Sequence, residues 1–298
     1  MLEPLVWAIR GFYLLSCVAI LAVRLIPSLR DRFLAYGARD PASTAARRPD
    51  PTKTVLGAQL LDFAASLKVP HSWFTHFYVV SVLSSLCCMV ALSDRSPAAV
   101  FEVPRFCSAL MLFQGGRRLL ECAFVSRPGN SRMWIGHYAI GLAFYMATNI
   151  AIWAEHLALS SKADTRMHGH GTLSQSLWTP RVVTCTLLFF YASYKQHRYH
   201  RYLAQLRKYT LPDVDAFHFI VAPHYTAECG IYLALAVLDA PRDHGQGRPV
   251  NWTLVCALIF VMVNLGITAD GTQTWMMDKF PDRKEDVRRR WKMIPGLW

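Results

Sequence analysis

Ionisable and amide side chains recur inside or beside the long apolar runs of this chain, where burial in lipid is costly. A histidine can exchange a proton near neutral pH, and an arginine can bind a phosphate through two hydrogen bonds. His224 and Glu228 are four residues apart, which places them on one helix face just after Pro223. The full set is His71, His76, Gln114, Arg117, Arg118, Glu121, Asn130, Arg132, His137, Gln196, His197, Arg198, His200, Arg207, His218, His224, Glu228, Asn264, Asp270 and Gln273. These residue types predict acid–base and anion-binding chemistry.

Simpler interpretations exist for several of these residues. Arg117 and Arg118 are also typical of topology anchors at the end of a span, and Glu121 is placed to pair with Arg117 along one helix. His71 and His197 are also typical of interfacial residues. The eight cysteines form no CxxC pair, and we find no HExxH, so the sequence predicts no metal site. Walker A, G-x-S-x-G and G-x-G-x-x-G motifs are absent as well.

The composition is that of a membrane protein. Hydrophobic residues make up 53% of the 298 residues and charged residues only 17%, below the roughly 25% of a soluble domain. The net charge of +12 comes from basic residues that flank apolar blocks. We therefore predict no nucleic-acid partner, because nucleic-acid sites need a basic stripe or patch.

Seven apolar segments are long enough, at about 20 residues, to cross a bilayer as helices. They are residues 5–24, 73–93, 99–120, 134–157, 178–195, 215–238 and 252–271. The sequence thus predicts an all-α, polytopic membrane protein with seven transmembrane helices. A further stretch, Thr54–Lys68, has apolar residues at helical spacing and predicts an amphipathic helix at the membrane interface.

The distribution of basic residues predicts the orientation of these spans. Segments 24–72, 114–133, 195–214 and 271–298 hold 24 of the 32 Lys and Arg residues. The positive-inside rule places these segments in the cytosol, the N-terminus in the lumen and the C-terminus in the cytosol. Nearly all the polar residues named above then lie at cytosolic helix ends. Such a basin suits a soluble, anionic cofactor that meets a lipid-soluble substrate.

Several motifs resemble one enzyme family. They are VPHSWFTHFYVVSVL (Val69–Leu83), RRLLECAFVS (Arg117–Ser126), NSRM (Asn130–Met133), KQHRYHRYLAQLRK (Lys195–Lys208), FHFIVAPHYTAECGIYLALAV (Phe217–Val237) and WMMDKFPD (Trp275–Asp282). In this order they are similar to the steroid 5-alpha-reductase family, and within it to the polyprenol reductase branch. The resemblance covers about residues 55–298, so we predict a catalytic domain there. Residues 1–54 are predicted to form an N-terminal anchor helix and a basic cytosolic loop.

The resemblance implies a fold of seven helices in the endoplasmic reticulum membrane, with NADPH bound from the cytosol. It implies reduction of a carbon–carbon double bond conjugated to a carbonyl, and a polyprenoid lipid as the substrate. In this branch the product is dolichol, the lipid carrier of protein N-glycosylation. Positions that match the family's cofactor pocket are Asn130, Arg132, Gln196, His200, Arg207, His224 and Glu228, together with Asn264 in the last span.

Two departures from the family pattern bear on the substrate. The steroid-reducing members use a glutamate and a tyrosine to polarise the substrate carbonyl. Here His76 and Phe77 stand at the glutamine–glutamate pair, and Gly115 stands near the tyrosine, which argues against a 3-ketosteroid. Met276 replaces a tyrosine that the family usually has after an aromatic residue.

Hydride is a nucleophile, so it adds readily to an electron-poor alkene and poorly to an allylic alcohol. We therefore predict polyprenal as the immediate substrate and dolichal as its product. His76 is the first candidate for the group that donates a hydrogen bond to the developing enolate, with Tyr78 and His71 behind it. Residues predicted to bind the phosphates of NADPH are Arg117, Arg132 and Arg207, while His224 and Glu228 orient its nicotinamide or ribose.

Other functions compete with this interpretation. A reductase of the same family could act on a steroid or on an enoyl thioester. A lipid transporter without catalysis is disfavoured, because we find neither paired repeats nor Gly-rich segments in the middle of a span. An enzyme similar to isoprenyl-cysteine methyltransferases would bind S-adenosylmethionine in place of NADPH.

Overall fold

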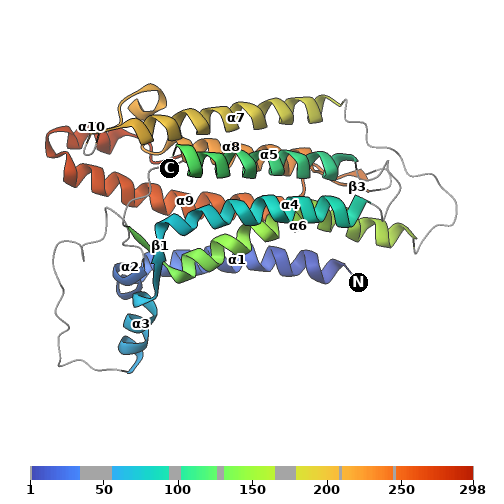
Figure 1. The fold of residues 1–298 in the computed structure, drawn as a ribbon, viewed down its shortest axis with the longest axis horizontal. Helices are drawn as coiled ribbons and strands as arrows, with labels where there is room; N and C mark the ends of the chain where they lie inside the picture. Colours follow the sequence, from blue (N-terminus) through green and yellow to red (C-terminus); the bar gives the residue numbers. More distant parts are fainter. Residues whose placement is uncertain are drawn as a thin grey trace.

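The computed structural model describes residues 2–33, 56–93, 102–125, 131–164, 179–207, 210–243 and 246–297. Within these residues, seven long helices lie side by side along the longest axis of the molecule (Figure 1). They are α1 (Glu3–Leu25), α4 (Thr75–Ser93), α5 (Glu102–Phe124), α6 (Ile135–Asp164), α7 (Pro180–Gln205), α8 (Pro223–Leu238) and α9 (Trp252–Lys279). Helices suit a chain in lipid, because each satisfies its backbone hydrogen bonds internally.

The structure is mostly helical, in agreement with the predicted fold class, whereas the count of seven transmembrane helices is not confirmed. Within the described residues, four helical segments are long and apolar enough to cross a membrane: Glu3–Leu25, His71–Leu92, Ile135–Ser161 and Trp252–Lys279. The helix α8 has 16 residues, and α5 and α7 carry the ionisable side chains described below.

The start of α8 and the ends of α6, α7 and α9 differ from the predicted boundaries by seven to ten residues. The sixth apolar segment was expected to begin at residue 215, but α8 begins at Pro223, where proline is favoured because its fixed φ suits the first helical turn. Residues Asp215–His218 form the separate 3₁₀ turn η4. The helix α7 continues ten residues past the predicted end, to Gln205. The prediction ended where the polar residues begin, but in the structure these residues remain helical and point into the polar network described below or out of the bundle.

Short elements gather at one end of the bundle. The helix α2 (Pro27–Phe33) follows α1, and α3 (Leu56–Ser66) projects sideways from the bundle (Figure 1). The strand β1 (Lys68–Pro70) pairs antiparallel with β2 (Arg132–Trp134), and η3 (His71–Phe74) leads from β1 into α4. This small sheet fixes the start of α4 beside the start of α6.

The helix predicted over Thr54–Lys68 is confirmed as α3. Its apolar side chains Leu60 and Phe63 are exposed, with Phe63 at 65%. One charged residue, Asp62, pairs with Arg32 of α2 at 2.5 Å. Its location at a membrane interface stays a prediction.

The chain returns to the same end of the bundle at its C-terminal segment. After α9 come η5 (Pro281–Arg283) and α10 (Lys284–Arg289). Trp291 then pairs with Ile220 ahead of α8, and the Gln273 side chain of α9 donates to the carbonyls of Val287 and Arg290. The segment from Val287 to Trp291 thus connects the start of α8 with the C-terminal part of α9 through hydrogen bonds.

Aromatic side chains fill the centre of the bundle. Tyr13 of α1, Phe144 of α6 and Phe260 of α9 contact one another, with ring centroids 5.1–6.2 Å apart. Tyr232 of α8 also packs on Phe144, with ring centroids 5.5 Å apart. Offset and edge-on ring pairs of this kind add about 0.5–1.5 kcal/mol each beyond their buried area. The core thus ties α1, α6, α8 and α9 together.

A second polar cluster lies at the opposite end, which the sequence analysis did not predict. Glu155 of α6 pairs with Arg10 of α1 at 2.7 Å and accepts the backbone N–H of Thr253. His156 and Asn251 both bond to Asp239, at 3.1 and 2.7 Å. The strands β3 (Arg242–Asp243) and β4 (Gln246–Gly247) lie nearby in sequence. The polar residues singled out from the sequence include none of this second cluster, so polar groups lie at both ends of the bundle.

Candidate active site

A cavity of about 1230 Å³ lies among the helices, near the end that carries β1 and β2. One part of its wall is apolar and comes mainly from α4, α6 and α9, including Phe77, Ile140, Phe144, Phe260, Val261 and Leu265. The polar part includes Arg24, Arg30, His71, Tyr78, Arg118, Gln196, His200, Glu228, Asn264, Asp270 and Asp278. A pocket for one small ligand typically measures about 300–1,000 Å³, so this cavity has room for more than one small ligand.

Tyr78 is a polar group that neighbouring side chains hold in place at the cavity wall. Its side chain is 3% exposed, and its hydroxyl accepts hydrogen bonds from Nε and Nη2 of Arg118, at 3.1 and 2.8 Å. The guanidinium carbon also lies 4.8 Å from the centre of the Tyr78 ring. Since both bonds use the oxygen as acceptor, the hydroxyl hydrogen remains available to a ligand in the cavity.

Arg118 is held in turn by groups on α5 and α7. Its Nη1 pairs with Glu121 and lies 2.6 Å from Nδ1 of His200. The other Glu121 contacts come from Arg117 and from both histidines, His197 at 2.7 Å and His200 at 2.9 Å. One carboxylate therefore joins the two helices beside the cavity.

Amide side chains extend this network to α8. Gln196 accepts hydrogen bonds from Gln114 at 3.0 Å and from Arg117, and it donates to Glu228. Glu228 and Gln196 both line the cavity. The chain of contacts thus runs from the middle of α5 through α7 to Glu228.

The structure separates the two residues predicted to be catalytic. Successive residues of a helix turn by about 100°, so positions 76 and 78 face nearly opposite sides of α4. His76 is exposed, bonds to the hydroxyl of Tyr138 at 2.9 Å, and does not line the cavity. The geometry therefore brings Tyr78, and not His76, to the cavity.

Among the predicted cofactor residues, Gln196, His200, Glu228 and Asn264 meet at the cavity. Arg117 reaches it through Gln196, and His224 packs on His200 with ring centroids 5.5 Å apart. Arg132 on β2 and Arg207 after α7 are exposed and do not line the cavity. Asn130 lies outside the described residues.

The position of Met276 settles a point left open by the sequence. Met276 is buried against Val221 and Val287, while its neighbour Trp275 lines the cavity. The departure from the family's tyrosine therefore falls on a packing position of this chain.

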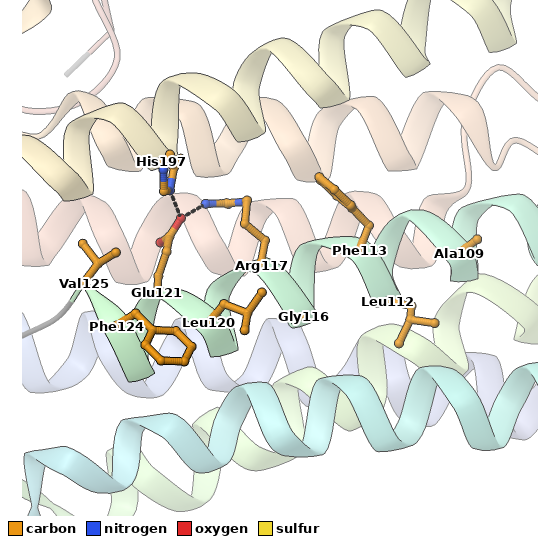
Figure 2. A pocket seen from close by; sticks show the side chains of 10 residues that line it. All are labelled: Ala109, Leu112, Phe113, Gly116, Arg117, Leu120, Glu121, Phe124, Val125 and His197. Carbon is orange, nitrogen blue, oxygen red and sulfur yellow. Dashed lines mark hydrogen bonds and ion pairs between the residues drawn. The ribbon is translucent and has the colours of Figure 1, made fainter.

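A second, mostly apolar pocket of about 670 Å³ lies on the outer side of α5, facing α7 (Figure 2). Its wall is formed by Leu112, Phe113, Leu120, Phe124 and their neighbours. At one end, Arg117, Glu121 and His197 point toward one another (Figure 2). Glu121 therefore lines this outer pocket directly and contacts the inner cavity through His200.

A family model described as 3-oxo-5-alpha-steroid 4-dehydrogenase matches residues 140–298, which is more than half of the chain. The chain belongs to this family. It is the steroid 5-alpha-reductase family that the motifs resemble, so that prediction is confirmed. The matched region carries the cavity residues of α7 to α9 and those of α6 from Ile140 onward, while Tyr78, Arg118 and His137 precede it.

Relatives of this family member cover most of its length. A polyprenal reductase of Saccharomyces cerevisiae is 25% identical over 286 residues, covering 94% of this chain and 92% of the relative. Polyprenal reductase 2 of Oryza sativa subsp. japonica is 27% identical, covering 78% and 80%. The human polyprenal reductase is 27% identical, covering 64% and 68%. These family members are named as reductases.

Sequence reasoning missed several cavity residues of this reductase family member. Arg118 was considered as a topology anchor, yet it donates a hydrogen bond to Tyr78. Its position four residues after Gln114 and three before Glu121 places the three side chains on one helix face, which was a usable signal of a polar cluster. Tyr145 of α6 also lines the cavity, with its ring 5.5 Å from that of Tyr78. A tyrosine inside an apolar run carries no sequence signal that separates it from a core residue.

Proposed function

We propose that this chain uses NADPH to reduce the α-isoprene double bond of a polyprenal, giving dolichal. The observation that carries the proposal is the Tyr78 hydroxyl, which Arg118 holds at the wall of a cavity that is part apolar and part polar. Names of the relatives support the substrate class. Overall conversion of polyprenol to dolichol then needs separate oxidation and reduction of the alcohol end.

The chemistry requires a donor at the aldehyde oxygen. Bound NADPH supplies a hydride to the β carbon of the enal. Negative charge then develops on the aldehyde oxygen, where the Tyr78 hydroxyl donates a hydrogen bond or its proton. A fixed donor of this kind stabilises the transition state by about 3–4 kcal/mol. Reduction is completed by one proton at the α carbon, so each turnover takes one hydride and one proton.

The cavity wall disfavours a 3-ketosteroid. Phe77, which stands where steroid-reducing members have a glutamate, lines the cavity with an apolar ring. A Cβ atom on Gly115 would lie 2.8 Å from Oγ of Ser81, so the helices leave no space there for a tyrosine. The two residues that polarise a steroid carbonyl are thus replaced by residues that cannot do so.

The polar side of the cavity fits a dinucleotide cofactor. Guanidinium groups of Arg24 and Arg30 line it and match phosphate oxygens in geometry and charge. Gln196 and Asn264 offer the amide groups that bind a nicotinamide amide or a ribose. Since Arg132 and Arg207 lie away from the cavity, they are not assigned to the phosphates.

We further propose that α1 and α4 to α9 all cross the endoplasmic reticulum membrane. The described parts of the segments richest in Lys and Arg lie at the end of the bundle that carries α2, β1 and α10, which supports a cytosolic location for that end and a luminal N-terminus (Figure 1). The isoprenoid tail leaves sideways into the surrounding lipid. Dolichal then serves dolichol synthesis and protein N-glycosylation. The proposal also includes the division of the chain into an N-terminal anchor and basic loop, residues 1–54, and a catalytic domain, residues 55–298.

The experiment compares three substrates with the purified full chain in lipid nanodiscs and NADPH: polyprenal, polyprenol and a 3-ketosteroid. We expect turnover of polyprenal to dolichal, and none of polyprenol in the absence of an oxidant. Turnover of polyprenol without an aldehyde intermediate contradicts the aldehyde proposal. Preferential turnover of the steroid favours the activity for which the family model is named.

A further inference from the structure

Glu121 is a buried carboxylate on which four positively charged or protonatable groups converge. It is 2% exposed and pairs with Arg117 and Arg118 of its own helix. His197 and His200 reach it from α7, at 2.7 and 2.9 Å. Figure 2 shows Glu121 between α5 and α7, with Arg117 and His197 directed toward it. Arg117 and Arg118 donate to this carboxylate, while Nδ1 of each histidine donates to it only when that nitrogen carries a proton.

Arg118 divides its nitrogen atoms between this carboxylate and Tyr78. One terminal nitrogen pairs with Glu121, while Nε and the other terminal nitrogen donate to the Tyr78 hydroxyl. A planar guanidinium bound on two edges has a fixed orientation. Without the carboxylate, this edge keeps only its contact with His200, and the repulsion between the adjacent positive charges of Arg117 and Arg118 is less well compensated.

We infer that Glu121 is a positioning residue for the reduction: it orients Arg118, and Arg118 orients the Tyr78 hydroxyl toward the substrate carbonyl. This inference rests on the function proposed above. Glu121 itself does not line the cavity, so it acts through its neighbours. The burial of these ion pairs does not by itself imply that they stabilise the fold, because the cost of desolvating the charges offsets much of their attraction.

The test is a double-mutant cycle in the full chain in nanodiscs, comprising wild type, Glu121→Gln, Tyr78→Phe and the double variant. Glutamine keeps the size of the side chain and removes its charge. We expect Glu121→Gln to lower kcat by about 10- to 100-fold, with the KM for polyprenal changed by less than about threefold. Because Glu121 acts through Tyr78, the double variant should fall within about threefold of Tyr78→Phe alone.

A matched control is Glu285→Gln, which makes the same change at an exposed carboxylate that pairs with Arg288 at 3.7 Å. It should keep wild-type kcat. Losses that multiply in the double variant overturn the inference, because they show that Glu121 acts independently of Tyr78. Wild-type kcat in Glu121→Gln overturns it as well.

Two further measurements separate positioning from folding and from the proposed function. If Glu121→Gln does not fold, Glu121→Asp keeps the charge and serves in the same cycle, with partial loss of kcat expected and the same coupling to Tyr78. Wild-type turnover is measured first with polyprenal, a 3-ketosteroid and an enoyl thioester. Reduction of one of the latter two refutes the polyprenal proposal and leaves the cycle to be run on that substrate, whereas reduction of none refutes both.

Discussion

Replacing Tyr78 by phenylalanine removes one oxygen atom from the cavity wall. The hydroxyl accepts two hydrogen bonds from Arg118, at 2.8 and 3.1 Å, so its hydrogen is the group offered to the substrate. Loss of one donor to a developing oxyanion costs about 3–4 kcal/mol in the transition state, which corresponds to about 10²- to 10³-fold in kcat. The KM should change little, since the uncharged aldehyde of the ground state accepts a weaker hydrogen bond.

The stability of the variant can be bounded from the same contacts. Arg118 loses one acceptor that took two of its hydrogen bonds, and an unsatisfied buried group costs about 1–3 kcal/mol. Because the side chain is 12% exposed and keeps its pair with Glu121, the chain should still fold. A thermal unfolding scan in detergent checks this before kinetics are measured.

The assay is NADPH oxidation with polyprenal in nanodiscs, with dolichal quantified by mass spectrometry. Tyr138→Phe is the matched control, because its hydroxyl bonds to His76 at 2.9 Å and it does not line the cavity. We expect the control to retain wild-type kcat within about twofold. If Tyr78→Phe keeps kcat within threefold of wild type, the donor assignment is refuted.

Three further changes have definite expected outcomes. His76→Ala should leave kcat within about twofold, because His76 is exposed outside the cavity; a loss near 100-fold would restore it as the donor. Asn251→Ala should lower the free energy of unfolding by about 1–2 kcal/mol, since Asn251 caps α9 and bonds to Asp239 at 2.7 Å; an unchanged thermal midpoint would contradict this. Gly141→Ala should cost about 1–3 kcal/mol and lower turnover, because a Cβ atom there lies 2.6 Å from the Phe77 ring at the cavity wall; unaltered stability and kinetics would show that the ring moves freely.

The helices were largely predictable because apolar runs report directly on burial in lipid. Each of the seven predicted spans overlaps a helix of the structure. The start of α8 was not predicted, because Phe217–Val221 is as apolar as the helix that follows Pro223. A hydropathy average reports only how apolar a segment is, so it does not detect the point at which the backbone changes from the η4 turn to the helix α8.

The sequence indicated which polar residues lie close together, but it did not indicate which helix face turns toward the cavity. Gln196, His200, Glu228 and Asn264 were correctly placed near one another, because their residue types are costly in lipid. Tyr78 was ranked behind His76, since a sequence does not state which face of α4 turns toward the cavity. Arg10 was overlooked, because its partner Glu155 lies 145 positions away and only folding brings the pair together.

The central claim is that hydride adds to the carbon–carbon double bond of an enal beside Tyr78. The most direct measurement supplies the full chain with polyprenal and NADPH that carries deuterium at the transferred position, followed by NMR of the product. We predict deuterium at the β carbon of dolichal, with no label at the aldehyde carbon. Deuterium at the former aldehyde carbon, in a product that keeps its double bond, would contradict the account.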